Sequence, residues 1–348
     1  MGTAVTEPVC EGCGAPLGKG MEATTRGRGR PARYCNDACR ARAYRARKTG
    51  RRRALPAMAA AHLVLADARR LPLPDASVDL IVTSPPYFAQ RSYGADGEDL
   101  AGQIGCESSP EEYLEAMWAC TAEWARVLKP SGSMFVLLGD KYHGAPGGAV
   151  QGGACGVRSE HDRKRGRTQY APKRHKVTTS VPTKSLFGMP WRYAIGCVDR
   201  LGLVHRAEMI WHKPNPMPES VADRVVRAHE TVFHFTRSPK YWHDPEHARL
   251  PSVWTVPTTP LKVPAELEDA RHFAAMPEAL PRRLILGYAP PLGIVLDPFG
   301  GTGTTAAAAK ALGRVGISSD LSPAYTQLAA WRSQTLPDTV RRRAATRR

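Results

Sequence analysis

The segment Ser84-Pro85-Pro86-Tyr87 combines residue types that could hold a planar amino group. It follows 78–83, an apolar run typical of a buried strand. The two prolines fix the backbone and remove two N–H donors, which leaves the Ser84 hydroxyl and nearby carbonyls as rigid acceptors. Such acceptors could turn the lone pair of an exocyclic amine toward an electrophilic methyl group, with Tyr87 as a stacking face for the ring. A Pro-Pro turn alone is more often only a turn, so the interpretation depends on its companions.

A second segment, 297–304, follows another predicted strand and opens an alanine-rich helix. Its glycines let the backbone approach a ligand closely, and the helix start supplies free N–H groups suited to a carboxylate. Asp297, at the strand end, can offset a cationic amino acid group. The segment matches neither the triphosphate-loop pattern nor the dinucleotide pattern, and its alternative interpretation is a tight turn without a ligand. The loop comprises Asp297, Pro298, Phe299, Gly300, Gly301, Thr302, Gly303 and Thr304.

The next predicted strand ends at Asp320, roughly 20 residues beyond the loop, the spacing of a ribose-binding acid in nucleotide folds. In this architecture an acid at that position reaches a ribose hydroxyl. The alternative is that Asp320 caps the following helix, and both roles can hold together.

The elements that must position these residues alternate between strand and helix patterns. This alternation predicts an α/β fold, a mostly parallel sheet covered by helices on both faces. Ligands bind such sheets at the carboxyl ends of the strands, where both segments lie. We expect strands at 62–66, 78–83, 133–138, 293–296 and 314–319, and helices at 111–128, 190–201, 277–287, 304–312 and 324–331.

Composition divides the chain into a basic module over 1–53, a domain over 54–336 with a basic insertion at 141–183, and a basic, disordered tail over 337–348. The formal charge is +17, which predicts attraction to nucleic acid; a basic protein without such a partner is the alternative. No apolar run approaches transmembrane length and no signal peptide is evident, so we expect a cytoplasmic, nucleoid-associated protein without membrane contact. The sequence leaves monomer and homodimer open.

The module over 1–53 contains two cysteine pairs, C-x2-C and C-x3-C, at zinc-ligand spacing. Four thiolates spaced in this way fit a closed, tetrahedral structural zinc site, and a strongly basic segment follows them. DNA docking and a metal-stabilised fold without readout both fit, and free reduced cysteines are a third interpretation. The expected ligands are Cys10, Cys13, Cys35 and Cys39.

The two segments together resemble the amino-methyltransferase family of DNA methylases, with the catalytic motif ahead of the cofactor motif as in its β group. Residues 211–216, 229–235 and 272–277 resemble the same family. The resemblance implies a Rossmann-like methyltransferase fold with a seven-stranded sheet and S-adenosyl-L-methionine as cofactor. It assigns catalysis to Ser84, Pro85, Pro86 and Tyr87. It assigns cofactor binding to Asp67, Asp297, Phe299, Gly300, Gly301, Thr302, Gly303, Thr304 and Asp320, with Asp67 at the cofactor adenine.

In this family, serine at the first motif position goes mostly with cytosine N4, so Ser84 favours that base over adenine N6. The usual recognition region is short here, and the insertion at 141–183 is a candidate to read DNA, or else a nonspecific phosphate-binding arm. Three alternatives remain at this stage: an adenine N6 enzyme, a methyltransferase for RNA or a protein amide, and a DNA-binding scaffold without catalysis.

Overall fold

The chain divides between Leu55 and Pro56, and all residues described in this computed structural model belong to the second part. The expected zinc ligands and most of the basic insertion therefore lie outside the described residues. Within the described residues, no helix is both long and apolar enough to span a bilayer. The structure describes 59–90, 93, 100–144, 177–216, 218–219, 221–259, 261, 263–264, 267 and 275–345, with side chains to 334.

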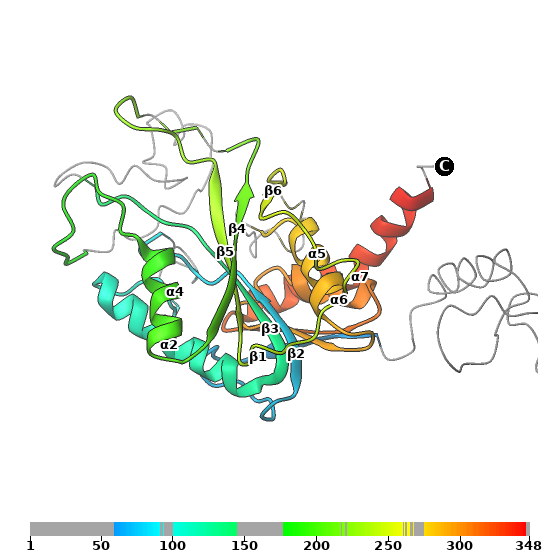
Figure 1. The fold of residues 1–348 in the computed structure, drawn as a ribbon. Helices are drawn as coiled ribbons and strands as arrows, with labels where there is room; N and C mark the ends of the chain where they lie inside the picture. The colour runs from blue at the N-terminus through cyan, green and yellow to red at the C-terminus, as the bar shows by residue number, and fades with distance from the viewer. Residues whose placement is uncertain are drawn as a thin grey trace, which may run out of the picture. The chain divides into compact units, whose positions relative to one another are not determined.

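One sheet forms the centre of the domain, and its strands run in the order β1-β8-β7-β2-β3-β5-β4-β6 (Figure 1). β5 alone runs antiparallel to its neighbours. The sheet is thus mostly parallel as expected, but it has eight strands instead of seven, because the three-residue β6 pairs with β4 at the edge. The strands are β1 Ala61–Leu65, β2 Val78–Thr83, β3 Leu128–Leu138, β4 Val204–His212, β5 His229–Thr236, β6 Val253–Thr255, β7 Ile294–Asp297 and β8 Val315–Asp320.

Helices cover both faces of the sheet, as Figure 1 shows, with α2 and α4 on one face and α5 and α6 on the other. Successive residues of a strand point to opposite faces, so β3 supplies both cores. Met134 and Val136 enter the core under α2 and α4, whereas Phe135 and Leu137 enter the core under α5 and α6. The helices are α2 Pro110–Val127, α4 Met189–Asp199, α5 Ala279–Tyr288, α6 Thr304–Ala311 and α7 Pro323–Ala345.

The C-terminal helix differs from the sequence expectation. Helix α7 continues through Pro337 to Ala345, over most of the segment 337–348 that the sequence predicts to be disordered. That prediction depends on Pro337 as a helix stop and on the arginine run as a solvated tail. Arginine and alanine are strong helix formers, and the 341–345 run consists of them alone, which favours continuation of the helix.

The order of the strands places β2 beside β7, although more than 200 residues of chain separate them. The two strands are parallel and in register, with Leu80 opposite Val295 and Ile81 opposite Leu296. Their carboxyl ends therefore lie side by side at one edge of the sheet. The segments that follow these two ends are the two motifs singled out in the sequence.

Candidate functional site

The loops after β2 and β7 line a common cavity of about 460 Å³, within the range of small-molecule sites. Ser84 and Tyr87 come from the first loop, and Asp297 and the glycine-rich segment come from the second. The structure thus brings together two groups of residues that the sequence predicted separately. From the predicted set, this larger cavity is lined by Ser84, Pro85, Tyr87, Asp297, Phe299, Gly300, Gly301, Thr302 and Thr304.

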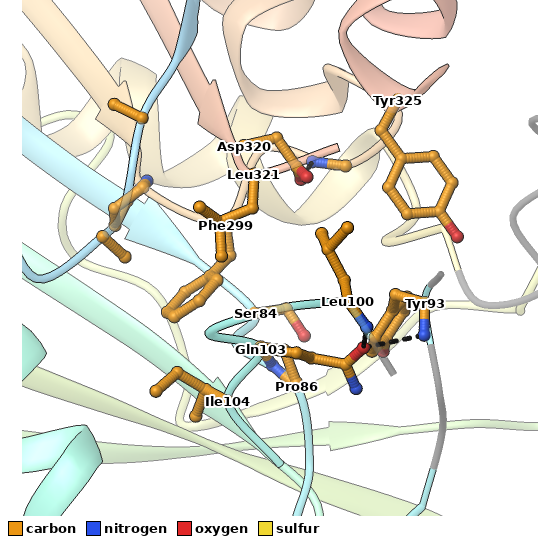
Figure 2. Close-up of a pocket in the computed structure, with 14 residues that line it drawn as sticks. Ser84, Pro86, Tyr93, Leu100, Gln103, Ile104, Phe299, Asp320, Leu321 and Tyr325 are labelled. Carbon is orange, nitrogen blue, oxygen red and sulfur yellow. Dashed lines mark hydrogen bonds between the residues drawn. The ribbon is translucent and has the colours of Figure 1, made fainter. Parts of the chain in front are cut away.

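A smaller pocket (Figure 2) meets the larger cavity at the residues that line both, which are Ser84, Tyr93, Phe299 and Gly301. Its walls are mostly apolar, and the Asp320 carboxylate lines it. An apolar slot with one carboxylate suits a ligand that has a flat ring and hydroxyl groups. The pocket is lined by Ala66, Ala68, Ser84, Pro86, Tyr93, Leu100, Gln103, Ile104, Pro298, Phe299, Gly301, Asp320, Leu321 and Tyr325.

Packing behind the glycine-rich loop explains two of its glycines without reference to a ligand. A Cβ on Gly300 would lie 1.8 Å from the Ser318 Oγ on β8. Gly303 has a φ of 71°, and a Cβ there would lie 2.6 Å from the Ala329 Cβ on α7. These contacts seat the loop directly against the sheet and α7, with the first N–H groups of α6 at the cavity.

Asp297 is a buried acid at the end of β7, and the loop and the first turn of α6 hold its two oxygens. The Thr305 hydroxyl donates to Oδ2 at 2.9 Å, and the Phe299 N–H donates to Oδ1 at 3.2 Å. Burial raises the pKa of Asp297 to about 6. A buried carboxylate with a raised pKa has no fixed countercharge, so a cationic ligand group would favour its ionised form.

Asp320 serves as a turn acceptor while it lines the smaller pocket. Its Oδ2 accepts from the Gly301 N–H at 2.8 Å, and its Oδ1 accepts from the Ser322 N–H at 2.8 Å. Burial raises the pKa of Asp320 above its usual value. The carboxylate therefore ties the glycine loop to the start of α7, and both expected roles remain compatible.

Two of the predicted cofactor residues, Asp67 and Gly303, line neither cavity. Asp67 is held elsewhere by an ion pair. Its carboxylate accepts from Arg69, with 2.6 Å between Arg69 Nη2 and Asp67 Oδ2, and Arg69 also donates to the Gly102 carbonyl. Burial acts to raise the pKa of Asp67, but the hydrogen bonds from Arg69 outweigh it and lower the pKa. The neighbouring Ala66 and Ala68 line the smaller pocket instead.

A hydrogen-bonded chain leads away from the first motif into β4 and β5. The Tyr87 hydroxyl donates to Glu230 Oε2 at 2.6 Å, and Ser84 Oγ lies 3.5 Å from the Tyr87 oxygen. Lys213 binds the other oxygen of Glu230. Burial and then the charge of Glu230 raise the pKa of Tyr87 well above its usual value, so its phenol stays protonated. Glu230 and Lys213 are not among the predicted site residues, although both fall in the segments 211–216 and 229–235 that resemble the family.

Cationic side chains also line the larger cavity, which Tyr87 and Glu230 line as well. Arg224 stacks on Tyr142, at 3.7 Å from its ring centroid, and pairs with Glu219. Lys141 and Arg227 line the same cavity. A cavity bordered by Lys and Arg suits a ligand that carries phosphates.

Gly139, which follows β3, lets the Tyr87 ring lie directly against the backbone. A Cβ at this position would lie 2.6 Å from the ring. We expect Gly139→Ala to displace the ring and to reduce turnover about tenfold, the cost of a modest overpacking. Gly144→Ala is the matched control, because a Cβ there meets nothing within 4 Å. Steady-state kinetics with thermal melts checks this; equal turnover of both variants would show that the ring position is unimportant.

Metal binding has no support in the part of the chain that the structure describes, where no group of three or more His, Cys, Asp or Glu could hold an ion. The expected ligands Cys10, Cys13, Cys35 and Cys39 lie outside that part.

Comparison with known proteins agrees with the geometry. A family described as DNA methylase matches residues 78–330. The chain is 36% identical over 283 residues to the type II methyltransferase M.XycI of Xanthomonas campestris pv. cyanopsidis, a match that covers 78% of this chain and 87% of the relative. It is 35% identical to the type II methyltransferase M.Cfr9I of Citrobacter freundii, with the same two coverages.

Two solved structures share this fold. One is a protein from Thermus thermophilus in complex with S-adenosyl-L-methionine, with a TM-score of 0.50, 25% identity and coverage of 78% of this chain and 92% of that one. The other is the PvuII DNA methyltransferase (cytosine-N4-specific), with a TM-score of 0.58, 21% identity and coverage of 80% and 90%.

Proposed function

Because the chain belongs to the DNA methylase family of N6 and N4 methyltransferases, we propose that it methylates the N4 amino group of cytosine in duplex DNA. The chain is an S-adenosylmethionine-dependent, site-specific DNA methyltransferase with an α/β methyltransferase fold. The choice of base and the roles of individual residues are the proposed part. The residue roles are supported by one observation, the adjacent ends of β2 and β7, from which both motifs line one cavity.

The cofactor brings an electrophilic methyl group on a sulfonium. The smaller pocket fits its adenosine part, with apolar walls around Phe299 and the Asp320 carboxylate for ribose hydroxyls. The buried Asp297 suits the cationic amino group, and the start of α6 suits the carboxylate. A contact from Asp67 would require its ion pair with Arg69 to open. The residues proposed to hold the cofactor are Asp297, Phe299, Gly300, Gly301, Thr302, Gly303, Thr304 and Asp320.

Ser84 to Tyr87 would act on a base that has left the duplex stack, as in other enzymes that modify a base. Ser84 and the adjacent carbonyls accept hydrogen bonds from the amino group, which directs the nitrogen lone pair toward the methyl group. Tyr87 stacks against the ring. Pro85 and Pro86 keep this segment rigid, and the Tyr113 hydroxyl donates to the Pro86 carbonyl at 2.9 Å.

The preference for cytosine rests on serine at position 84. To test it, the chain is expressed in a host whose DNA carries no amino-methylated bases, and the DNA is digested to nucleosides for mass spectrometry. We expect N4-methyldeoxycytidine in this DNA and none in DNA from a Ser84→Ala strain. N6-methyldeoxyadenosine instead would keep the enzyme class and overturn the choice of base.

We further propose that the N-terminal cysteines hold one structural zinc ion, a proposal supported by their C-x2-C and C-x3-C spacing alone. We expect the purified full-length chain to contain about one zinc per molecule by elemental analysis, as a four-thiolate site requires. Paired Cys10→Ser and Cys13→Ser substitutions should remove it, whereas Cys106→Ser, outside the cluster, should not. Zinc that survives the paired substitutions would refute the site.

DNA is the expected partner of the basic regions as well as of the cavity. The insertion at 141–183 holds eight Lys and Arg against two acids between Arg158 and Lys176. Such a segment can bind phosphates, and we propose it as the part that helps to select the target site.

A further inference from the structure

Glu230 lies where two strands and the first motif meet. It is the second residue of β5, opposite Trp211 on β4. Lys213, just after β4, binds Glu230 Oε1 and lies over the Trp211 ring, at 4.5 Å from its centroid. The side chains of Lys213 and Glu230 keep 20% and 15% of their exposure, so the pair is largely shielded from water. Such a pair can hold fixed orientations better than an exposed one.

The hydrogen bonds that join Lys213, Glu230 and Tyr87 can run in only one direction, because of the chemistry of these side chains. An ammonium only donates and a carboxylate only accepts, so Glu230 accepts a hydrogen bond from Lys213 at one oxygen and from the Tyr87 hydroxyl at the other. Tyr87 is committed as a donor at 2.6 Å, which leaves its oxygen as an acceptor toward Ser84 at 3.5 Å. If Ser84 donates to that oxygen, the lone pairs of Ser84 Oγ remain for a different partner.

We propose that Glu230 is a positioning residue that sets the direction of the Tyr87–Ser84 hydrogen bonds, so that Ser84 presents an acceptor to the target amino group. The inference rests on the proposed roles of Ser84 and Tyr87. If these hydrogen bonds ran in the opposite direction, the Ser84 hydrogen would point at the amine. It would then compete for the lone pair that must attack the methyl group. Lys213 completes this arrangement, because it donates to the other Glu230 oxygen and so orients the carboxylate.

Glu230→Gln tests the direction with little change in shape. Lys213 can only donate, so it would hold the amide oxygen and leave the amide NH2 facing the Tyr87 oxygen. Tyr87 would then accept from the amide and donate to Ser84, which reverses the direction of these hydrogen bonds. We expect kcat to fall about 10- to 100-fold, comparable to losing one oriented hydrogen bond at a reacting group. The KM values for DNA and cofactor should change less than about threefold, since ground-state binding is untouched.

Two further variants separate direction from simple support of β4 and β5. The Tyr87→Phe variant already lacks the hydroxyl that joins Glu230 to Ser84. Adding Glu230→Gln to it should therefore lower kcat by less than about a further twofold. Lys213→Met added to Glu230→Gln frees the amide to turn its oxygen toward Tyr87, and kcat should recover severalfold. Glu115→Gln, which removes the acid of an exposed ion pair with Arg200, is the matched control. Steady-state kinetics gives kcat and KM for each variant, and single turnover with enzyme in excess gives the rate constant of the methyl-transfer step itself.

An equal loss from Glu230→Gln in the wild-type and Tyr87→Phe backgrounds would overturn the proposal, as would wild-type kcat in Glu230→Gln or no recovery with Lys213→Met. The parent assignment fails separately: full turnover in Tyr87→Ala would remove Tyr87 from catalysis altogether. Loss in Tyr87→Ala together with normal Glu230→Gln would refute only the role of Glu230.

Discussion

Replacing Tyr87 by alanine is expected to lower methyl transfer by about 100-fold or more while cofactor binding survives. The substitution removes the stacking face for the target base, worth about 1–3 kcal/mol, and the hydroxyl that links Glu230 to Ser84. A hydrogen bond to a charged group adds about 1.5–3 kcal/mol, and each 1.4 kcal/mol is about tenfold in rate. Tyr87 does not line the smaller pocket proposed for the adenosine part of the cofactor, and it is not among the residues proposed to hold the amino acid part, so the cofactor should bind within about twofold of wild type.

Single-turnover rates and calorimetric titration with S-adenosylmethionine check the two halves of this result. Tyr241→Ala is the control, because Tyr241 packs against Tyr288 and His234, away from both cavities. Retained turnover in Tyr87→Ala would remove Tyr87 from the reaction. Loss of cofactor binding in parallel with turnover would instead place Tyr87 in the cofactor site.

Replacing Asp297 by asparagine is expected to raise the dissociation constant for S-adenosylmethionine about 10- to 100-fold. The amide keeps the shape, since its oxygen can accept from the Phe299 N–H and its NH2 can donate to the Thr305 hydroxyl, but it loses the charge proposed to offset the cationic amino group. A hydrogen bond to a charged group is worth about 1.5–3 kcal/mol, which corresponds to this change in affinity.

The pH dependence gives a second signature of the same residue. Burial raises the pKa of Asp297 to about 6, so below that pH the acid is neutral and its attraction for a cation is lost. Wild-type affinity should therefore rise as pH increases through about 6, and Asp297→Asn should lack this rise. The stability of the cofactor-free protein has the opposite sign, since a raised acid pKa costs stability as pH rises from its usual value through 6. The gain in melting temperature of the variant over wild type should accordingly be larger at pH 7.5 than at pH 4.

Calorimetric titration measures the dissociation constant for S-adenosylmethionine across this pH range. Asp244→Asn serves as the control, because Asp244 lies at a surface turn. Unchanged affinity in Asp297→Asn would remove the residue from the cofactor site. A pH-dependent rise that persists in the variant would assign the titration to another group.

The two motif loops could be predicted from sequence because each follows a strongly apolar strand directly. β2 and β7 lie within one residue of their expected positions. Parallel-sheet geometry then implies that their ends share one edge. Strands β4, β5 and β6 were missed as strands: β4 interrupts its apolar pattern with His205, Arg206 and Glu208, and its place depends on pairing with β5. No local pattern encodes that pairing.

The site residues show the same division between local and long-range signals. The family resemblance assigns Asp67 to the cofactor adenine, and in the structure Arg69, two residues later, pairs with its carboxylate. That competitor was visible in the sequence. The Tyr87–Glu230 contact was not, because its partners are 143 residues apart and meet only through the order of β2, β3 and β5. Gly139 is a third case of a long-range signal. Glycine is required there because a Cβ would collide with the Tyr87 ring, which the sequence around Gly139 does not reveal.

The most direct test of the account is to incubate purified protein with duplex DNA and S-adenosylmethionine labelled with deuterium in its methyl group. The DNA is then digested, and the labelled nucleosides are identified by mass spectrometry. The account predicts label on an exocyclic amino nitrogen, as N4-methyldeoxycytidine, and no label with Tyr87→Ala. Label on a ring carbon, or equal label with Tyr87→Ala, would contradict the mechanism built on Ser84 and Tyr87.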